Sequence, residues 1–206
     1  MKEAERNHVL PIDDRRVERF NPAIAGRPDL LGGRKTLTVY EGMTGMMMEN
    51  TFINVKGVRH SVTAEVVVPD AKTEGVIIAQ AGYFGGWTLY MRGGKVHHEY
   101  NLFGLDHTNI ASKSALAPGK HTIGYEFIPD EAKPGTGGKS ILSIDGQQVA
   151  EGHIPRTQPF AFSGDEGADV GMDGETNVSN DYKQGDNAFT GKIVKVTVSQ
   201  LQPGKR

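Results

Sequence analysis

The residues of this chain that could carry binding chemistry are concentrated in an acidic loop and in an aromatic stretch. The loop, 163–187, reads SGDEGADVGMDGETNVSNDYKQGDN and holds several carboxylates among glycines. Asp165, Asp169 and Asp173 could supply the hard oxygen ligands that calcium prefers, and the glycines would let the backbone wrap around the ion. The spacing does not match the helix-flanked calcium loop, and acidic glycine-rich connections are commonly solvated. Calcium binding and plain solvation therefore both remain open.

The aromatic residues gather in the glycine-punctuated stretch 75–105. Four of them could form a platform on which sugar rings stack, namely Tyr83, Trp87, Tyr90 and Tyr100. The alternative is that these rings fill the core of the sheet in which they lie. The sequence thus leaves open a carbohydrate-binding surface and a purely structural role.

Two further groups of residues resemble metal-ligand sets. His97 and His98, with His107 following closely, could suggest a zinc site. Adjacent side chains of a strand point to opposite faces of the sheet, so His97 and His98 cannot easily reach one ion. The run 43–48, MTGMMM, offers thioethers that could bind copper or flexible side chains that fill a loop or core. For both groups the sequence favours the structural interpretation.

Composition excludes several classes of function. The 206-residue sequence contains no cysteine, which rules out disulfides, thiolate metal sites and cysteine nucleophiles. It has 23 basic and 25 acidic side chains, a formal net charge of −2 and no basic stripe, so we expect no nucleic-acid partner. No apolar run reaches the roughly 18 residues of a membrane span, and the first residues lack the apolar segment of a secretory signal. We therefore expect a soluble chain and assign it to no compartment.

Short strands separated by turn residues dominate the sequence. Gly93-Gly94 and Asp145-Gly146 each predict a two-residue hairpin turn. In 60–68, valine and alanine alternate with polar residues, which predicts a strand with one buried face. Other strands are predicted within 75–105 and at 35–40, 51–55, 120–128, 140–144, 147–153, 159–162 and 188–201.

About eleven or twelve strands with almost no helix predict an all-β fold. We expect a two-sheet antiparallel β-sandwich of the jelly-roll or concanavalin A-like lectin type. The sandwich should span 35–203 as one domain. Residues 1–34 are polar and contain several prolines, with room for a short helix at 2–6, and they predict an extended N-terminal arm or interdomain linker.

Several segments, in their order along the chain, resemble the C-terminal region of the large bacterial arylsulfatases. In that family an arm similar to HVLPIDDRRVERFNPAIAGRP precedes a β-sandwich. The likeness continues through TAEVVVP, EGVIIAQAGYFGGWTLYM, YNLFGL, TQPFAFSGDEGADVGMD and FTGKIVKVTV. The resemblance implies a domain that packs on a sulfatase catalytic domain or a second subunit. It transfers no catalytic residue, because the C/S-x-P-x-R motif that yields formylglycine is missing and the calcium aspartates of the catalytic domain do not map here.

Two functions therefore remain open, both without catalysis by this chain. The first is an accessory domain of a sulfuric-ester hydrolase, and the second is a carbohydrate-binding, lectin-like module with calcium as a candidate ion. A glucanase-type hydrolase would need two carboxylates about 5 to 10 Å apart on one sheet face. The strand glutamates Glu65, Glu99 and Glu126 show no paired E-x-D-x-E spacing, which argues against that third class.

Overall fold

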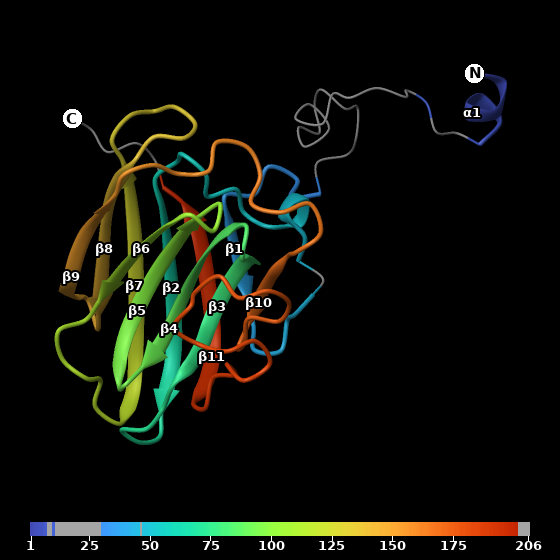
Figure 1. Ribbon diagram of the computed structural model, residues 1–206. Coiled ribbons are helices and arrows are strands. Elements are labelled where there is room, and N and C mark those ends of the chain that lie inside the picture. The colour runs from blue at the N-terminus through green and yellow to red at the C-terminus, as the bar shows by residue number, and fades with distance from the viewer. Residues whose placement is uncertain (8–9, 11–29, 46, 202–206) are drawn as a thin grey trace.

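Two antiparallel sheets packed face to face make up the body of the protein (Figure 1). The computed structural model describes residues 1–7, 10, 30–45 and 47–201. The larger sheet has the strand order β1 (Thr36–Val39), β11 (Lys192–Gln200), β2 (His60–Val68), β7 (Gly119–Pro129), β8 (Gly138–Ile144) and β9 (Gln147–Ile154). The smaller sheet has the order β10 (Ala168–Val170), β3 (Gly75–Gly82), β4 (Gly85–Arg92), β5 (Lys95–Leu102) and β6 (Asp106–Ala111). The predicted all-β, two-sheet antiparallel sandwich is confirmed.

Period-two alternation directs one face of each sheet into a shared core. Val62, Ala64, Val66 and Val68 of β2 are all buried, as their spacing predicts. On the facing sheet, alternate residues of β4 enter the same core, among them Trp87, Leu89 and Met91. Each fully buried large apolar side chain contributes roughly 1.5 to 3 kcal/mol, so the two inner faces hold the layers together.

The predicted hairpin turns are present where glycine permits left-handed backbone. Gly93 and Gly94, both with positive φ, join β4 to β5, and Asp145-Gly146 joins β8 to β9 in the same way. Positive φ at both central residues gives a turn whose twist matches that of the flanking strands. These two turns therefore set the register of their hairpins.

Three local predictions need correction. Residues 51–55 are not a strand, because Thr51 ends a short 3₁₀ helix η1 (Glu49–Thr51) and the following apolar residues cover one end of the core as irregular chain. Residues 159–162 are also irregular, and Pro159 has no N–H to give to a sheet. Strand β10, in contrast, lies inside the segment that the sequence presented as an acidic loop.

The N-terminal arm falls largely outside the described residues. The helix that the sequence allowed at 2–6 is present as α1 (Lys2–Arg6). Residues 8–9 and 11–29, which include most of the segment resembling the sulfatase arm, lie outside the described part of the chain. Across the described ranges, no helix has both the length and the apolar character that a bilayer span requires.

Close packing on β4 gives a first testable expectation. A Cβ added at Gly86 would lie only 2.1 Å from the Gln80 carbonyl oxygen, which is backbone and cannot rotate away. Gly86→Ala should therefore lower the free energy of unfolding by about 1 to 3 kcal/mol. Gly164→Ala is the matched control, because a Cβ there meets nothing within 4 Å. Urea unfolding curves that coincide for the two variants would contradict this packing.

Candidate functional site

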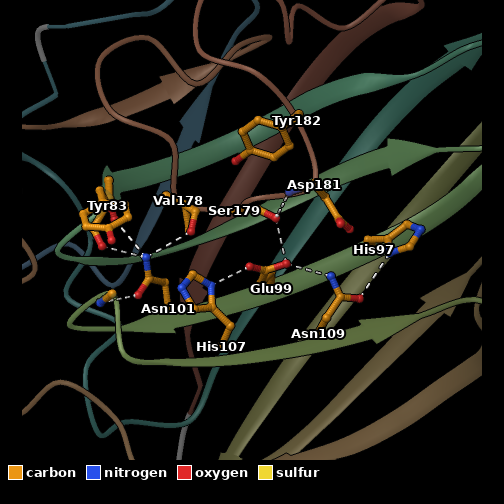
Figure 2. Close-up of polar contacts among 12 residues, drawn as sticks. Tyr83, His97, Glu99, Asn101, His107, Asn109, Val178, Ser179, Asp181 and Tyr182 are labelled. Atoms are coloured by element: carbon orange, nitrogen blue, oxygen red, sulfur yellow. Dashed lines mark hydrogen bonds and ion pairs between the residues drawn. The ribbon is translucent and has the colours of Figure 1, made fainter.

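The face of the smaller sheet that points away from the core carries a concentration of polar side chains. Alternation along β5 directs His98, Tyr100 and Leu102 inward, so His97, Glu99 and Asn101 lie on the outer face. The adjacent strand β6 adds two more polar residues, and the long loop 171–187 crosses over the same face. Figure 2 shows these side chains pointing toward one another between the loop and the two strands.

The loop is fixed to the sheet by a small apolar cluster of its own. Val178 packs with Val76, Ala79 and Tyr90 of the outer face, and Tyr182 lies against them. The ring of Tyr182 meets the ring of Tyr90 edge-on at 5.3 Å. This contact keeps the polar end of the loop next to β5 and β6.

Glu99 is the centre of the polar contacts. Its Oε1 accepts a hydrogen bond from His107 Nδ1 at 2.8 Å. Its Oε2 accepts from Asn109 Nδ2 and from Ser179 Oγ, each at 2.8 Å. These donors offset the cost of burying a carboxylate whose side chain is only 6% exposed. We call the group around it the Glu99 cluster, which consists of Tyr90, His97, Glu99, His107, Asn109, Ser179 and Asp181.

The Tyr90 hydroxyl joins the two halves of this cluster. It accepts from Asn109 Nδ2 at 2.7 Å and donates to Asp181 Oδ2 at 2.6 Å. Burial, reinforced by Asp181, raises the pKa of Tyr90 well above its ordinary value, so the phenol stays a hydrogen-bond donor. The Tyr90 ring stacks on His97 at 4.9 Å, and His97 Nδ1 contacts Asn109 Oδ1 at 3.2 Å.

The geometry of the cluster suits binding better than bond cleavage. Glu99 and Asp181 both contact the Tyr90 hydroxyl, at 3.4 and 2.6 Å. The two carboxylates therefore lie within about 6 Å of each other, near the separation found in glycosidases. Here, however, the Tyr90 hydroxyl fills the gap, and Glu99 is buried beneath its donors. A scissile bond has no place between these carboxylates.

The outer rim of the cluster is open to solvent. Asn109 is exposed, and the side chains of His107 and Asp181 are partly so. Arg92 adds a cation at the same rim, where its Nη1 lies 3.6 Å from Asp181 Oδ1. The rim thus combines amide, imidazole, carboxylate and guanidinium groups, which can both donate to and accept from the hydroxyls of a ligand.

The four aromatic residues expected to form a platform do not share one surface. Trp87 and Tyr100 are 2% and 7% exposed and belong to the core. Tyr90 is also buried, but on the opposite face under the loop, because it follows Trp87 by an odd number of residues along β4. Tyr83 alone of the four is open to solvent, at 48% exposure. The platform is therefore corrected to a single exposed ring.

The three carboxylates considered for calcium fasten the acidic loop to its surroundings. Asp165 accepts from Ser163 Oγ at 2.9 Å. Asp169 accepts backbone N–H groups from Gly45 at 2.7 Å and Gly174 at 3.0 Å. Within the ranges that the structure describes, no three His, Asp or Glu side chains are arranged to hold a metal ion. Calcium binding by Asp165, Asp169 and Asp173 stays a prediction.

Asp173 is held at the base of the loop by hydrogen bonds to its carboxylate. Its Oδ2 accepts from Val178 N–H at 2.8 Å and from Tyr182 Oη at 2.6 Å. Burial, reinforced by the negative charges of Asp169 and Glu166, raises the pKa of Asp173 to about 6. Asp173 therefore anchors the base of the loop that carries Ser179 and Asp181.

The structure shows where the histidines and two of the methionines considered as metal ligands lie. His97 and His98 do point to opposite faces, with His98 in the core and His97 in the Glu99 cluster. His107 contacts Glu99 rather than the other two histidines. In the methionine run, Met47 belongs to the core and Met43 is exposed.

Sequence reasoning missed the polar centre of the site. The available signal was the alternation of His97, Glu99 and Asn101 with His98, Tyr100 and Leu102 along β5. No local signal placed Ser179 and Asp181, because their position depends on the path of the loop across the sheet.

Comparison with known proteins supports the fold and no closer relationship. No protein-family model matches the sequence, and no curated protein matches it either.

Three solved structures illustrate the likeness in fold. Domains LG4-5 of the mouse laminin α1 chain are 17% identical, with a TM-score of 0.47, and the match covers 85% of this chain and 42% of that fragment. The CBM40 module of a Ruminococcus gnavus IT-sialidase, bound to α2,3-sialyllactose, is 15% identical, with a TM-score of 0.52, over 82% of this chain and 92% of the module. The SAP-like pentraxin of Limulus polyphemus is 12% identical, with a TM-score of 0.43, over 82% and 79%. The chain has the concanavalin A-like sandwich fold that the sequence predicted.

Proposed function

We propose that this chain is a carbohydrate-binding module that holds a glycan on the outer face of strands β5 and β6. The observation that carries the proposal is the Glu99 cluster, in which a buried carboxylate and a buried phenol fix Asn109, His107 and Asp181 at a solvent-open rim. The CBM40 module, which was solved with sialyllactose, supports the choice at the level of the fold.

Pre-organisation is the physical reason why this rim suits sugars. A glycan offers many hydroxyls, each of which loses hydrogen bonds to water on binding, so the protein must return them with good geometry. Side chains already fixed by neighbours lose little conformational entropy when the ligand arrives. Asn109 and His107 are fixed in this way because each is bonded to Glu99.

Substitution at the rim tests the proposal. Asn109→Ala should lower the affinity for any glycan that the wild-type protein binds by at least about tenfold, because it removes both a ligand contact and a donor that orders Glu99. A glycan array followed by isothermal titration with the strongest hit, with α2,3-sialyllactose included as a probe, provides the measurement. Thr197→Ala, on the outer face of the larger sheet, is the matched control and should bind as the wild type does.

The outcomes separate cleanly. Binding that falls in Asn109→Ala and persists in Thr197→Ala supports the outer face as the site. A wild-type protein that binds no glycan on the array overturns the proposal, as does an Asn109→Ala variant that binds with unchanged affinity.

A second candidate function is that of an accessory domain docked on a sulfatase catalytic domain or another subunit. It is supported by the ordered resemblance of the sequence segments and by exposed apolar residues at one end of the smaller sheet, among them Phe84, Phe103 and Leu105. None of the three solved structures named above is a sulfatase. A reading frame for a sulfatase catalytic domain directly upstream of this sequence would favour this function, and an unrelated neighbour would count against it.

A further inference from the structure

Tyr83 is an exposed aromatic ring at the tip of the β3–β4 hairpin. It is 48% exposed, and Phe84 beside it is more exposed still. Apolar ring surface left in water is unfavourable unless another molecule covers it. The Tyr83 and Phe84 rings contact each other and together expose apolar surface, a feature of interaction sites.

The backbone of Tyr83 is held on both sides by side chains from other elements. Its N–H donates to Thr176 Oγ1 at 2.9 Å, and its carbonyl oxygen accepts from Asn101 Nδ2 at 2.9 Å. Asn101 is completely buried, and its Oδ1 accepts the Gly104 N–H at 2.8 Å, which ties the β3–β4 tip to the β5–β6 tip. These three hydrogen bonds fix the backbone of the hairpin tip.

The ring itself is also positioned. Gly104 has a φ of +68°, and a Cβ there would lie 2.9 Å from the Tyr83 carbonyl oxygen and 3.3 Å from Tyr83 Cε1, so glycine lets both the backbone and the ring of Tyr83 lie close to this turn. The neighbouring Phe103 has a φ of +60°, a left-handed conformation that is unfavourable for a non-glycine residue. On the other side, the Phe84 ring meets the Tyr83 ring edge-on at 5.4 Å. Strained backbone held by its surroundings is typical of functional sites.

Tyr83 is continuous with the Glu99 cluster. Asn101 is the next outward residue after Glu99 on β5, and it pairs across the sheet with His107 of β6. Two residues along a strand span roughly 7 Å, so Asn101 links the rim of the cluster to the hairpin tip. Figure 2 shows Tyr83, Asn101 and His107 in this order at one end of the polar network.

We infer that Tyr83 forms a second subsite, in which its ring stacks on the apolar C–H face of a sugar next to the one held by the Glu99 cluster. The ligand class is then an oligosaccharide of two or more rings rather than a monosaccharide. This inference rests on the proposed function, because it extends the same glycan along the sheet toward the hairpin tips. The chemistry is that of an aromatic face against an aliphatic one, which needs no charge and tolerates different sugars.

The test varies both the length of the glycan and the presence of the Tyr83 ring. An array of glucose, galactose, mannose and xylose oligosaccharides, one to four residues long, together with sialyllactose, is probed with the wild type, Tyr83→Ala and Tyr83→Phe. For the wild type we expect affinity to rise at least about tenfold from one residue to two. Tyr83→Ala should bind the longer chains only as well as single sugars, and Tyr83→Phe, which keeps the ring, should match the wild type. Equal melting temperatures of the three proteins ensure that the tips stay folded.

Each result is decisive for one of the two proposals. If Asn109→Ala loses binding at every length while Tyr83→Ala binds as the wild type does, the second subsite is overturned and the proposed function stands. If the wild type binds single sugars as tightly as longer chains, the oligosaccharide class is overturned. If the wild type binds no glycan of any length, the proposed function itself fails and the subsite fails with it.

Discussion

Replacing His98 with phenylalanine should stabilise the protein in mild acid and remove most of its acid sensitivity between about pH 6 and 4.5. His98 is 1% exposed, and neither ring nitrogen has a hydrogen-bond partner in the described part of the chain. Its ring stacks on Tyr125 at 3.5 Å and on Trp87 at 6.1 Å. Burial therefore holds the pKa of His98 well below 6.5, with the charge of nearby His60 acting in the same direction.

The sign of the effect follows from proton binding. Burial also lowers the pKa of His60, to about 4. Below about pH 6.5 the unfolded chain protonates both histidines, and the folded protein does not. The stability that the two histidines contribute is therefore fully present above that pH and is lost as the pH falls. Each histidine contributes a loss of about 1.4 kcal/mol per pH unit. Asp173, whose pKa is raised to about 6, binds a proton in the folded state over the same range and offsets one of the two.

In the His98→Phe variant, His60 and Asp173 remain, and their opposite effects on the free energy of unfolding nearly cancel over this pH range. At pH 5 the variant should be more stable relative to the wild type than it is at pH 7, by up to about 2 kcal/mol. Urea unfolding at pH 7, 6 and 5 measures the difference. Asn180→Ala is the control, because Asn180 is exposed and carries no titratable group, so its loss should leave the acid slope unchanged. Parallel stability curves for the wild type and His98→Phe would refute the role of burial.

Removing the Asn101 side chain should be more damaging than removing any other polar side chain of the outer face. Its Nδ2 donates to the carbonyl oxygens of Tyr83 at 2.9 Å and Val178 at 3.0 Å, and its Oδ1 accepts from Gly104 N–H at 2.8 Å. One buried side chain thus satisfies backbone groups from two hairpin tips and the long loop. Asn101→Ala leaves these groups without partners, which should cost about 3 kcal/mol at roughly 1 kcal/mol each.

Asn101→Asp should be worse than Asn101→Ala at neutral pH. The carboxylate has no donor for the two carbonyl oxygens and places a buried negative charge against them. Chemical unfolding of both variants measures the order, with Asn180→Ala, an exposed residue of the same loop, expected within about 0.5 kcal/mol of the wild type. An aspartate variant as stable as the wild type would show that Asn101 does not hold the tips together.

The sequence predicted the sandwich because its signals are local. The alternation in β2 and the turn at Gly93-Gly94 depend only on neighbouring residues, and both are present in the structure. The prediction of a shared aromatic platform conflicts with the alternation of side chains along a strand. Trp87 and Tyr90 are separated by an odd number of strand positions and must face opposite ways. Counting parity along β4 would have separated them from the sequence alone.

The Glu99 cluster depends on longer-range order. Glu99 and Asn109 meet because β5 and β6 pair in one register, which the strand pattern implies but does not fix. Ser179 reaches Glu99 across 80 residues of chain, carried by a loop whose path is set by Val178, Tyr182 and Asp173. The apolar packing of that loop cannot be read from its acidic, glycine-rich composition.

The most direct test of the binding face is to locate a bound glycan by amide chemical shifts. The wild-type protein is titrated with the strongest oligosaccharide from the array, and the backbone amide signals are followed. We expect the largest shifts on His97, Glu99, Asn101, His107 and Asn109 and on the loop around Ser179. Shifts centred on the outer face of β2 and β7 in the larger sheet, with β5 and β6 unmoved, would contradict it.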